Sequence, residues 1–554
     1  MSTAQQFDAL IVGAGVSGVY ALYRLRDKLG LNVQVLEAGD GVGGTWYWNR
    51  YPGCRCDVES LEYSFGFDPE LEQEWSWPER YGNQPEILDY VNHVADRFDL
   101  RRNIQFETRV NHATYDRKTN LWTLETEAGE TFCAPICIMA TGNLSIPRVP
   151  DFPGLDDFQG ETYHTGLWPH EGVDFTGKRV AVIGTGSSGV QSIPIIASQA
   201  ETLTVFQRTA NYILPAANGP MNREIEAQHK ATYRERRKAA YDTPFGIAGY
   251  PPPEKSALEA TPAERNALYE QKWQEGGSIS FLYAYNDLLT NDDANKTARE
   301  FVHDKIRAIV KDQTIAEMLC PNDHPMGTKR LVLDTGYYET YNKQHVHLVN
   351  ARQTPIAGLT PKGIRLEDGT EYEFDAIVFA TGFDAMTGAL KEIDIRSVDS
   401  DSGDVRSLTE DWHAGPYTML GIMSAGFPNM FMITGPGSPG VKSQMILSCE
   451  QHVDWITDCL TYMREHGKAA IEPTEQSQHD WTMHVKEVAD QTLYPKAASW
   501  YMGANIPGKP RVFMPYVGGV NRYKAKIEAV AANGYEGFTF TPAKEPSLAL
   551  AGDD

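Results

Sequence analysis

Two glycine-rich loops, GAGVSG at residues 13–18 and GTGSSG at residues 184–189, each lie between two apolar runs. Twenty-four residues after its first glycine, the first loop is followed by Glu37 and the second by Arg208. Glycines let a backbone approach a pyrophosphate at a helix N-terminus, and the charged residue then meets the adenosine ribose. A carboxylate accepts hydrogen bonds from ribose hydroxyls, whereas a guanidinium binds a 2′-phosphate. The first loop therefore predicts an FAD site and the second an NADPH site.

The apolar runs around these loops predict the elements that position them. Residues 9–12 and 33–36 read as strands around the first loop, and residues 180–183 and 202–206 as strands around the second. This order of strand, loop, helix and strand, found twice, predicts an α/β fold with two Rossmann-like dinucleotide-binding domains. Charged, helix-favouring sequence after the second unit predicts a helical insertion.

Strand-like segments at 136–140 and 376–380 are each followed by Thr-Gly, and we expect the chain to pass between the two domains there. The expected division along the chain is the FAD-binding domain at 1–143 and 382–540, the NADPH-binding domain at 144–215 and 326–381, the helical insertion at 216–325, and a disordered tail at 541–554.

Composition excludes several classes of function. A net charge of −24 and a sequence pI near 5.0 oppose binding to nucleic acid or an anionic membrane surface. No apolar run reaches the ~18 residues of a membrane span, and the first strand begins too early for a signal peptide, so we expect a cytoplasmic protein. Seven scattered cysteines suit reduced thiols. We expect no metal site and a monomer.

Cys54 and Cys56 follow the first loop at about the distance of the redox pair in flavin disulfide reductases. Two cysteines that flank a single residue bridge only with strain. We therefore interpret both as residues without a redox role.

Three further motifs identify a family. They are GGTWYWNRYPGCRCD at 43–57, FQGETYHTGLWP at 158–169 and ATGFD at 380–384. Together they resemble the single-chain, FAD-containing Baeyer–Villiger monooxygenases, whose fingerprint is FxGxxxHxxxWP. The resemblance extends over the chain up to about residue 540. Within the fingerprint, we interpret His164 as a structural histidine and Trp168 as a packing residue.

The resemblance implies a reaction in which NADPH reduces FAD and O₂ then gives a C4a-peroxyflavin. Attack of this group on a ketone yields an ester or lactone, with sulfoxidation as an expected side activity. Negative charge develops on the oxygens, so a fixed cation that supplies no proton would stabilise them. Arg330 matches the catalytic arginine of the family, and Asp57 matches the carboxylate that holds it. Asp57 also reads as the N-cap of a helix at 57–60.

The resemblance also assigns residues to each ligand. Arg208, Lys329 and Thr209 match 2′-phosphate ligands, and Trp500 matches a contact of the nicotinamide end. With the glycine loops, the expected FAD contacts are Gly13, Gly15, Ser17, Gly18, Glu37, Gly44, Thr45, Trp46, Asp57, Tyr63, Val110 and Met445. Trp48 could equally be a flavin contact or a core aromatic residue. The expected NADPH contacts also include Gly184, Thr185, Gly186, Ser187, Ser188, Gly189, Gln191 and Arg330.

The substrate pocket is expected to contain Asn143, Leu144, Val441, Lys442 and Met445. Lys442 replaces an apolar residue of the family, so we expect it either to reach solvent or to make the pocket mouth wetter. An aliphatic, cyclic or aryl ketone would fit these residues.

Other functions remain open from the sequence. An N- or S-oxygenating flavin monooxygenase would share both glycine loops, although Trp168, Pro169 and the motif at 43–57 disfavour it. A flavin disulfide reductase would use Cys54 and Cys56. A flavoprotein that only senses NADPH would leave Arg330 and Asp57 unexplained.

Overall fold

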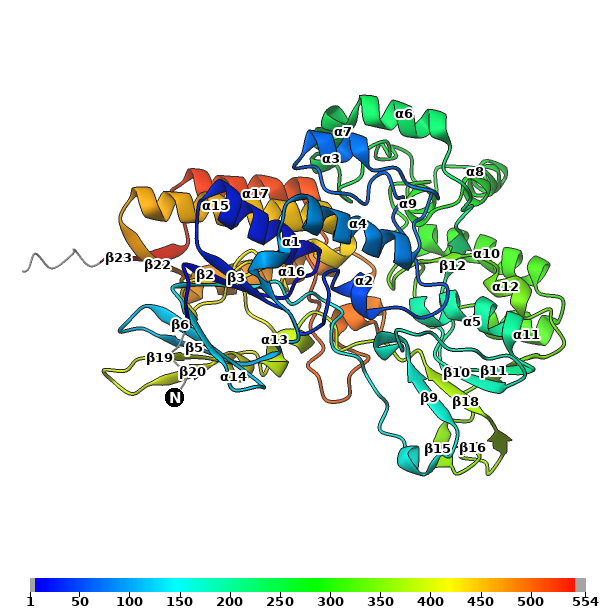
Figure 1. Cartoon of the computed structure of the whole chain (residues 1–554). Helices are drawn as coiled ribbons and strands as arrows, with labels where there is room; N and C mark the ends of the chain where they lie inside the picture. Colours follow the sequence, from blue (N-terminus) through cyan, green and yellow to red (C-terminus); the bar gives the residue numbers. More distant parts are fainter. Residues whose placement is uncertain (1–4, 544–554) are drawn as a thin grey trace, which may run out of the picture.

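The computed structural model describes residues 5–543 and has two α/β lobes joined side by side, with helices above the second (Figure 1). The first lobe contains an all-parallel sheet in the order β21-β8-β2-β3-β4. Its strands are β2 (Ala9–Val12), β3 (Val33–Leu36), β4 (Ile104–Gln105), β8 (Ile136–Met139) and β21 (Met430–Met432). All four β2 residues are buried, because both faces of this sheet are covered.

One face of this sheet is covered by α1 (Val16–Tyr23) and α15 (Met445–Glu465), and α17 (Val520–Ala532) lies against α15 (Figure 1). A second sheet, in the order β1-β7-β6-β5-β19-β20, covers the other face. Leu10, Trp122 and Met430 belong to the core cluster between the two sheets. The strands of the second sheet are β1 (Gln5–Gln6), β5 (Val110–Asp116), β6 (Leu121–Thr126), β7 (Thr131–Ala134), β19 (Asp394–Val398) and β20 (Val405–Ser407).

The second lobe repeats this plan. Its parallel sheet has the order β14-β11-β10-β18-β9, with α5 (Ser187–Gln199) following β10. The strands are β9 (Glu161–His164), β10 (Arg179–Ile183), β11 (Thr202–Gln207), β14 (Val346–Asn350) and β18 (Ala376–Phe379). An antiparallel sheet of β15 (Ile356–Thr360), β16 (Gly363–Leu366) and β17 (Glu371–Glu373) packs on it. The predicted fold class is thereby confirmed.

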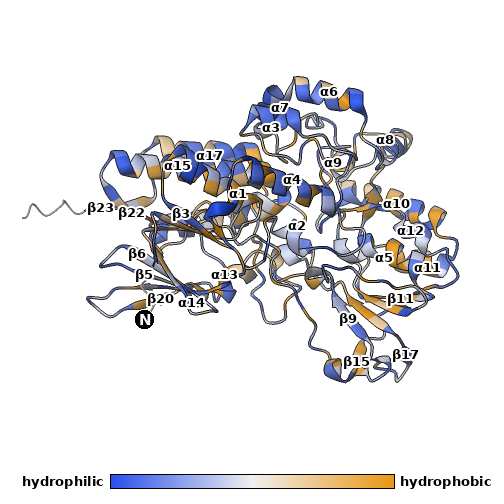
Figure 2. Cartoon of the chain, viewed as in Figure 1, coloured by the Kyte–Doolittle hydropathy of each residue, from blue (hydrophilic) through white to orange (hydrophobic). Residues whose placement is uncertain are grey.

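Six helices lie between β12 (Ile213–Pro215) and β13 (Val332–Asp334), two strands that pair in parallel. They are α6 (Arg223–Ala231), α7 (Tyr233–Tyr241), α8 (Pro262–Glu275), α9 (Ser278–Leu282), α10 (Asp292–Ile309) and α11 (Gln313–Leu319). Thr261 and Glu264 form a capping box that starts α8. Hydrophilic and hydrophobic residues are mixed along α6 and α8 in Figure 2. Helix α10 buries Ala294, Ala298, Val302 and Ile306 at helical spacing, as an amphipathic helix does.

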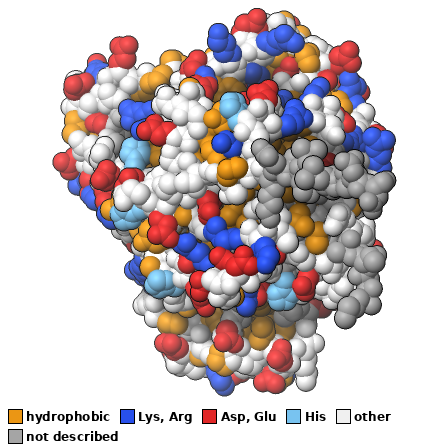
Figure 3. Space-filling view, turned by 90° about the vertical axis from the view of Figure 1, so that its left-hand side faces the viewer, with side chains coloured by type: hydrophobic (Ala, Val, Ile, Leu, Met, Phe, Trp, Pro, Cys, Tyr) orange, Lys and Arg blue, Asp and Glu red, His pale blue; other side chains and the backbone are white. Residues whose placement is uncertain are grey.

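The remaining helices are α2 (Thr45–Trp48), α3 (Pro69–Glu74), α4 (Gln84–Arg97), α12 (Tyr337–Thr340), α13 (Gly388–Glu392), α14 (Leu408–Asp411) and α16 (Glu475–Asp490). In residues 5–543 no helix is both long enough and apolar enough to cross a membrane. Acidic and basic side chains are interspersed on the face in Figure 3.

Two segments that connect the lobes run next to each other. Pro147 forms an isolated antiparallel bridge with Phe383. The amide of Arg148 donates to the carbonyl of Gly382 at 2.8 Å, and the amide of Asp384 donates to the carbonyl of Ile146 at 2.9 Å. The two crossings are therefore tied together, beside the space between the lobes.

The predicted disordered tail, 541–554, was wrong for its first three residues. Strand β23 (Phe538–Pro542) pairs with β22 (Lys468–Pro473), and the amide of Ala543 donates to the carbonyl of Gly467. Residues 541–543 are thus held by backbone hydrogen bonds. The rest of the predicted tail, 544–554, lies outside the described residues.

Candidate active site

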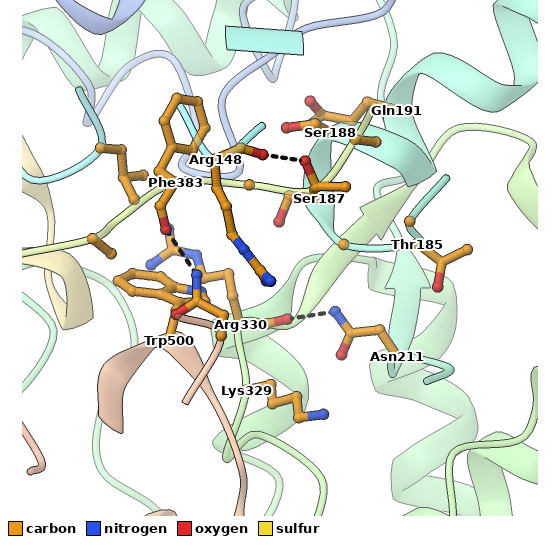
Figure 4. Close-up of a pocket in the computed structure, with 18 of the residues that line it drawn as sticks. Arg148, Thr185, Ser187, Ser188, Gln191, Asn211, Lys329, Arg330, Phe383 and Trp500 are labelled. Carbon is orange, nitrogen blue, oxygen red and sulfur yellow. Dashed lines mark hydrogen bonds between the residues drawn. The ribbon is translucent and has the colours of Figure 1, made fainter. Parts of the chain in front are cut away.

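A cavity of about 800 Å³ lies between the lobes (Figure 4). Residues from the first lobe, both crossings and the second lobe line it. The predicted residues on its wall are Thr45, Trp46, Asp57, Tyr63, Asn143, Leu144, Gly184, Thr185, Gly186, Ser187, Ser188, Gln191, Arg208, Thr209, Lys329, Arg330, Val441, Met445 and Trp500.

Arg330 and Asp57, 273 residues apart in sequence, form an ion pair on this wall. The guanidinium donates through Nε to Asp57 Oδ2 at 2.6 Å and through NH2 to Asp57 Oδ1 at 2.5 Å. Its NH1 donates to the carbonyl of Val441 at 2.7 Å. Burial lowers the pKa of Arg330, but the Asp57 carboxylate more than offsets this and holds that pKa above its ordinary value. The group is therefore a fixed cation.

Asp57 does not cap a helix, so that prediction was wrong. Residues 57–60 form bends and the start of a turn, and both carboxylate oxygens of Asp57 accept from Arg330. A partner distant in sequence takes the oxygens that a cap would need.

Cys54 and Cys56 are buried, free thiols. Burial raises the pKa of the Cys54 thiol to about 12 and that of the Cys56 thiol well above its usual range. A thiolate is the nucleophile in disulfide chemistry, so these thiols are poorly suited to it.

The second glycine loop opens onto the cavity. A Cβ added at Gly184 would lie 2.4 Å from the carbonyl oxygen of Ala380, and one at Gly189 would lie 2.3 Å from that of Gly184. A Cβ at Gly186 would meet no atom within 4 Å, because this residue faces the open space. Gly186 also ends the loop as the N-cap of α5 without a side-chain cap. The loop and helix N-terminus therefore fit a pyrophosphate.

Two predicted cations lie on the same wall. Across residues 5–543, neither Arg208 nor Lys329 has a recorded side-chain hydrogen bond or ion pair with the protein. Burial lowers the pKa of Lys329; the nearby Asp323 carboxylate partly offsets this, and the charge of Arg208 lowers the pKa again. Two like charges on one wall that no carboxylate pairs directly fit an anionic ligand such as a phosphate.

The first glycine loop is closely packed in the first lobe. Gly13 has φ +103°, and a Cβ there would lie 2.6 Å from the carbonyl oxygen of Ala140. Glu37 is 4% exposed and accepts from the amides of Ala14 at 2.6 Å and Gly39 at 2.8 Å. These contacts hold the carboxylate at the end of β3, as a ribose ligand requires. Gly13, Gly15, Ser17, Gly18, Glu37, Gly44 and Val110 are near these strand ends and are not part of the lining of the main cavity.

Two tryptophans after this loop have different surroundings. Trp46 lines the cavity and donates through its indole N–H to the Tyr63 hydroxyl at 3.1 Å. Trp48 contacts the ring of Tyr47 edge-on and is not part of the lining. Trp500, in a short 3₁₀ turn, lies near Arg330 (Figure 4).

Lys442 is not part of the main cavity lining and instead lines a second cavity of about 260 Å³. Its Nζ lies 4.5 Å from the ring centroid of Tyr494 and 4.6 Å from that of Tyr501, and it donates to the Tyr501 hydroxyl at 3.4 Å. Burial, together with the charge of Arg330, lowers the pKa of Lys442 to about 7. The amine thus packs against two aromatic rings while the residue is half-buried, and a wetter pocket mouth stays a prediction.

His164 is buried and holds the linker. Its Nε2 lies 3.1 Å from the carbonyl oxygen of Arg148, and its Nδ1 accepts from the amide of Gly166 at 3.0 Å. Trp168 packs against the rings of Tyr163 and Phe175. Both contacts agree with the structural interpretation of the fingerprint.

Sequence reasoning missed several residues on the wall. Arg148 and Asn211 line the cavity, and the amide of Asn211 donates to the carbonyl of Arg330 at 3.1 Å. Asn505 donates to the carbonyl of Phe383 at 2.7 Å. Gln191, a predicted NADPH contact, accepts a hydrogen bond from the Tyr51 hydroxyl and donates one to the carbonyl of Arg55. It therefore connects α5 to the 51–57 segment. No periodicity marks such residues, because tertiary contacts bring them to the cavity.

Residues 10–220 match the family described as pyridine nucleotide-disulphide oxidoreductase. A Baeyer-Villiger monooxygenase of Pseudooceanicola batsensis is 44% identical over 530 residues, which cover 96% of this chain and 95% of the relative. An acetone monooxygenase (methyl acetate-forming) of Gordonia sp. is 41% identical and covers 98% of this chain and 100% of the relative. A solved structure of an oxidized steroid monooxygenase bound to NADP is 51% identical, with a TM-score of 0.91, and covers 97% of this chain and 100% of its own.

Proposed function

The chain belongs to the Baeyer–Villiger monooxygenase family, and we propose that its reaction takes place in the 800 Å³ cavity beside Arg330. The enzyme uses FAD and NADPH and inserts one oxygen atom from O₂ next to a ketone carbonyl, giving an ester or lactone. The observation that carries the proposed location is the Arg330–Asp57 ion pair on a wall shared by both lobes.

Bound FAD supplies the redox chemistry with NADPH and O₂. Arg330 has five N–H donors, and its bonds to Asp57 and Val441 use three of them. Donors therefore remain for an oxygen of the reacting ketone. A raised pKa keeps the guanidinium charged, so it stabilises an oxyanion without giving up a proton. Asp57 fixes the plane and position of the group.

The cavity wall supports the remaining assignments. We propose that Arg208, Lys329 and Thr209 bind the 2′-phosphate of NADPH, and that Trp500 contacts its nicotinamide end. The proposed FAD contacts are those at the first loop and on the flavin side of the cavity, Thr45, Trp46, Tyr63 and Met445 among them. The predicted domain boundaries at 143, 215, 325 and 381 form part of the same proposal.

Asn143, Leu144, Val441 and Met445 give the wall near Arg330 an apolar character with one amide. We propose an aliphatic, cyclic or aryl ketone as substrate, with sulfoxidation as a side activity. The relatives named for acetone and steroid oxidation support a ketone and leave its size open. The seven cysteines, all free thiols, suit a reducing compartment, and we propose a monomer in the cytoplasm.

The test is product analysis with labelled oxygen. The FAD-loaded enzyme is incubated with NADPH, ¹⁸O₂ and a panel of acyclic, cyclic and aryl ketones, and products are identified by mass. We expect esters or lactones that carry one ¹⁸O atom, and no such product from Arg330→Ala. Oxidation of amines or sulfides alone, with every ketone unchanged, would favour the N- or S-oxygenating class.

A further inference from the structure

A third cation lies on the NADPH side of the main cavity. The side chain of Arg148 extends into the cavity (Figure 4). Within the described part of the chain, its guanidinium has no recorded hydrogen bond or ion pair, as is also true of Arg208 and Lys329. Other arginines of this acidic protein form ion pairs, for example Arg179 with Asp375, whereas these cations line a cavity without one.

The charge of Arg148 is poorly compensated by the protein. Burial lowers its pKa, and the nearby charge of Arg208 lowers it further. The chain has a net charge of −24. Two like charges on the wall of one cavity, half-buried at Arg148 and exposed at Arg208, therefore indicate that an anion binds there.

The backbone of Arg148 is held at three points. Its amide donates to the carbonyl of Gly382 at 2.8 Å. Its carbonyl accepts from the Thr381 hydroxyl at 2.5 Å and faces His164 Nε2 at 3.1 Å. Because Nδ1 of His164 accepts from a backbone amide, Nε2 carries the proton and donates to Arg148. These contacts fix where the side chain enters the cavity.

We propose that Arg148 is a third ligand of the NADPH 2′-phosphate and that His164, through the Arg148 carbonyl, is its positioning residue. This inference rests on the proposed assignment of the second loop and Arg208 to NADPH. A 2′-phosphate carries close to two negative charges at neutral pH, which suits a site with Arg148, Arg208 and Lys329. The pyrophosphate has its own donors at the N-terminus of α5.

Calorimetric titration of the FAD-loaded enzyme with NADP⁺, NAD⁺ and adenosine 2′-monophosphate tests this assignment without turnover. Arg148→Ala should raise the Kd for NADP⁺ and adenosine 2′-monophosphate about tenfold and leave the Kd for NAD⁺ within about twofold. Arg148→Lys keeps the charge but not the planar guanidinium, and it should raise the Kd for NADP⁺ less than Arg148→Ala does. Higher salt should weaken NADP⁺ binding more in the wild type than in Arg148→Ala.

Arg102→Ala is the matched control. The Arg102 side chain is 62% exposed in the first lobe, so its removal changes the net charge by the same amount away from the cavity. An unchanged Kd for NADP⁺ in Arg148→Ala would overturn the proposal. So would an equal loss for NADP⁺ and NAD⁺, which would assign Arg148 to the pyrophosphate.

Arg208→Ala in the same titration separates this inference from the proposed function. If Arg208→Ala weakens the binding of NADP⁺ and Arg148→Ala does not, only the proposed role of Arg148 fails. If neither variant changes the preference for NADP⁺ over NAD⁺, the assignment of the second loop fails with it.

A double-mutant cycle tests the positioning role of His164. His164→Ala should raise the Kd for NADP⁺ about threefold alone and have no further effect in Arg148→Ala. Additive effects would overturn the positioning role. Thr381→Val removes the other side-chain donor to the same carbonyl and gives an independent cycle if His164→Ala does not fold.

Discussion

Replacement of Asp57 by asparagine tests whether Arg330 must be held in place or only needs to be present. The two Asp57 oxygens accept from Nε and NH2 of Arg330, while NH1 donates to Val441. Asparagine keeps one acceptor oxygen but turns an NH₂ group toward the guanidinium donors. One charge-assisted bond and the ion pair are lost, and the bond to Val441 remains.

The size of the effect follows from these contacts. A hydrogen bond to a charged group contributes about 1.5–3 kcal/mol. The side chains of Arg330 and Asp57 are 29% and 22% exposed, so solvent screens the pair in part. If the lost orientation raises the barrier by about 1.5–3 kcal/mol, kcat/KM for the ketone falls roughly 10- to 100-fold. Asp57→Glu, which keeps the charge, should lose less.

The assay separates cofactor use from oxygen insertion. Flavin bleaching under anaerobic conditions gives the rate of reduction by NADPH, and mass analysis gives ester formed per NADPH consumed. We expect Asp57→Asn to bind NADP⁺ within about twofold of the wild type while ester yield falls and hydrogen peroxide release rises. Wild-type ester yield at wild-type kcat/KM would refute the reasoning, because Arg330 would then need no carboxylate.

Four further outcomes are expected. Arg330→Ala should bind FAD and be reduced by NADPH but lose on the order of 10²–10³ in the rate of ester formation, measured by product mass; a wild-type rate would remove it from catalysis. Cys54→Ala with Cys56→Ala should retain monooxygenation, and complete loss of NADPH oxidation with FAD still bound would favour the disulfide reductase. Arg208→Ala should raise KM for NADPH by roughly one to two decades and affect NADH much less; an unchanged preference would contradict this. Because the pKa of Lys442 falls to about 7 in the folded protein, its burial destabilises the protein progressively as pH falls from about 10 to about 7. As pH falls from about 10 to about 7, the Tm of Lys442→Met minus the Tm of the wild type should therefore increase, and below about pH 7 this difference should stay constant. A Tm difference that does not depend on pH would contradict the shift.

The sequence predicted the parallel strands well, because these strands are buried on both faces and are therefore mostly apolar. Residues 9–12, 33–36, 136–139 and 376–379 are all strands at the predicted places. The family motifs predicted that Arg330 and Asp57 meet across the lobes, and the structure pairs them. Such a contact follows from resemblance rather than from local sequence pattern.

The failures share one cause, which is a tertiary partner. A helix N-cap at Asp57 was plausible locally, but Arg330 takes its carboxylate. The sequence likewise did not predict the contacts of the Lys442 amine with the rings of Tyr494 and Tyr501. Residues 541–543 looked like a tail, yet β22 supplies a partner strand.

Arg148 shows the same limit for a functional residue. Neither its linker position nor its neighbours Pro147 and Pro150 predict a ligand contact. Its backbone is fixed by the second crossing and by the fingerprint histidine, both distant in sequence. If its guanidinium binds the 2′-phosphate, then the fingerprint histidine contacts the NADPH site directly, through the carbonyl of Arg148. A substitution at His164 would then change the choice between NADPH and NADH, although His164 itself forms no part of the cavity lining.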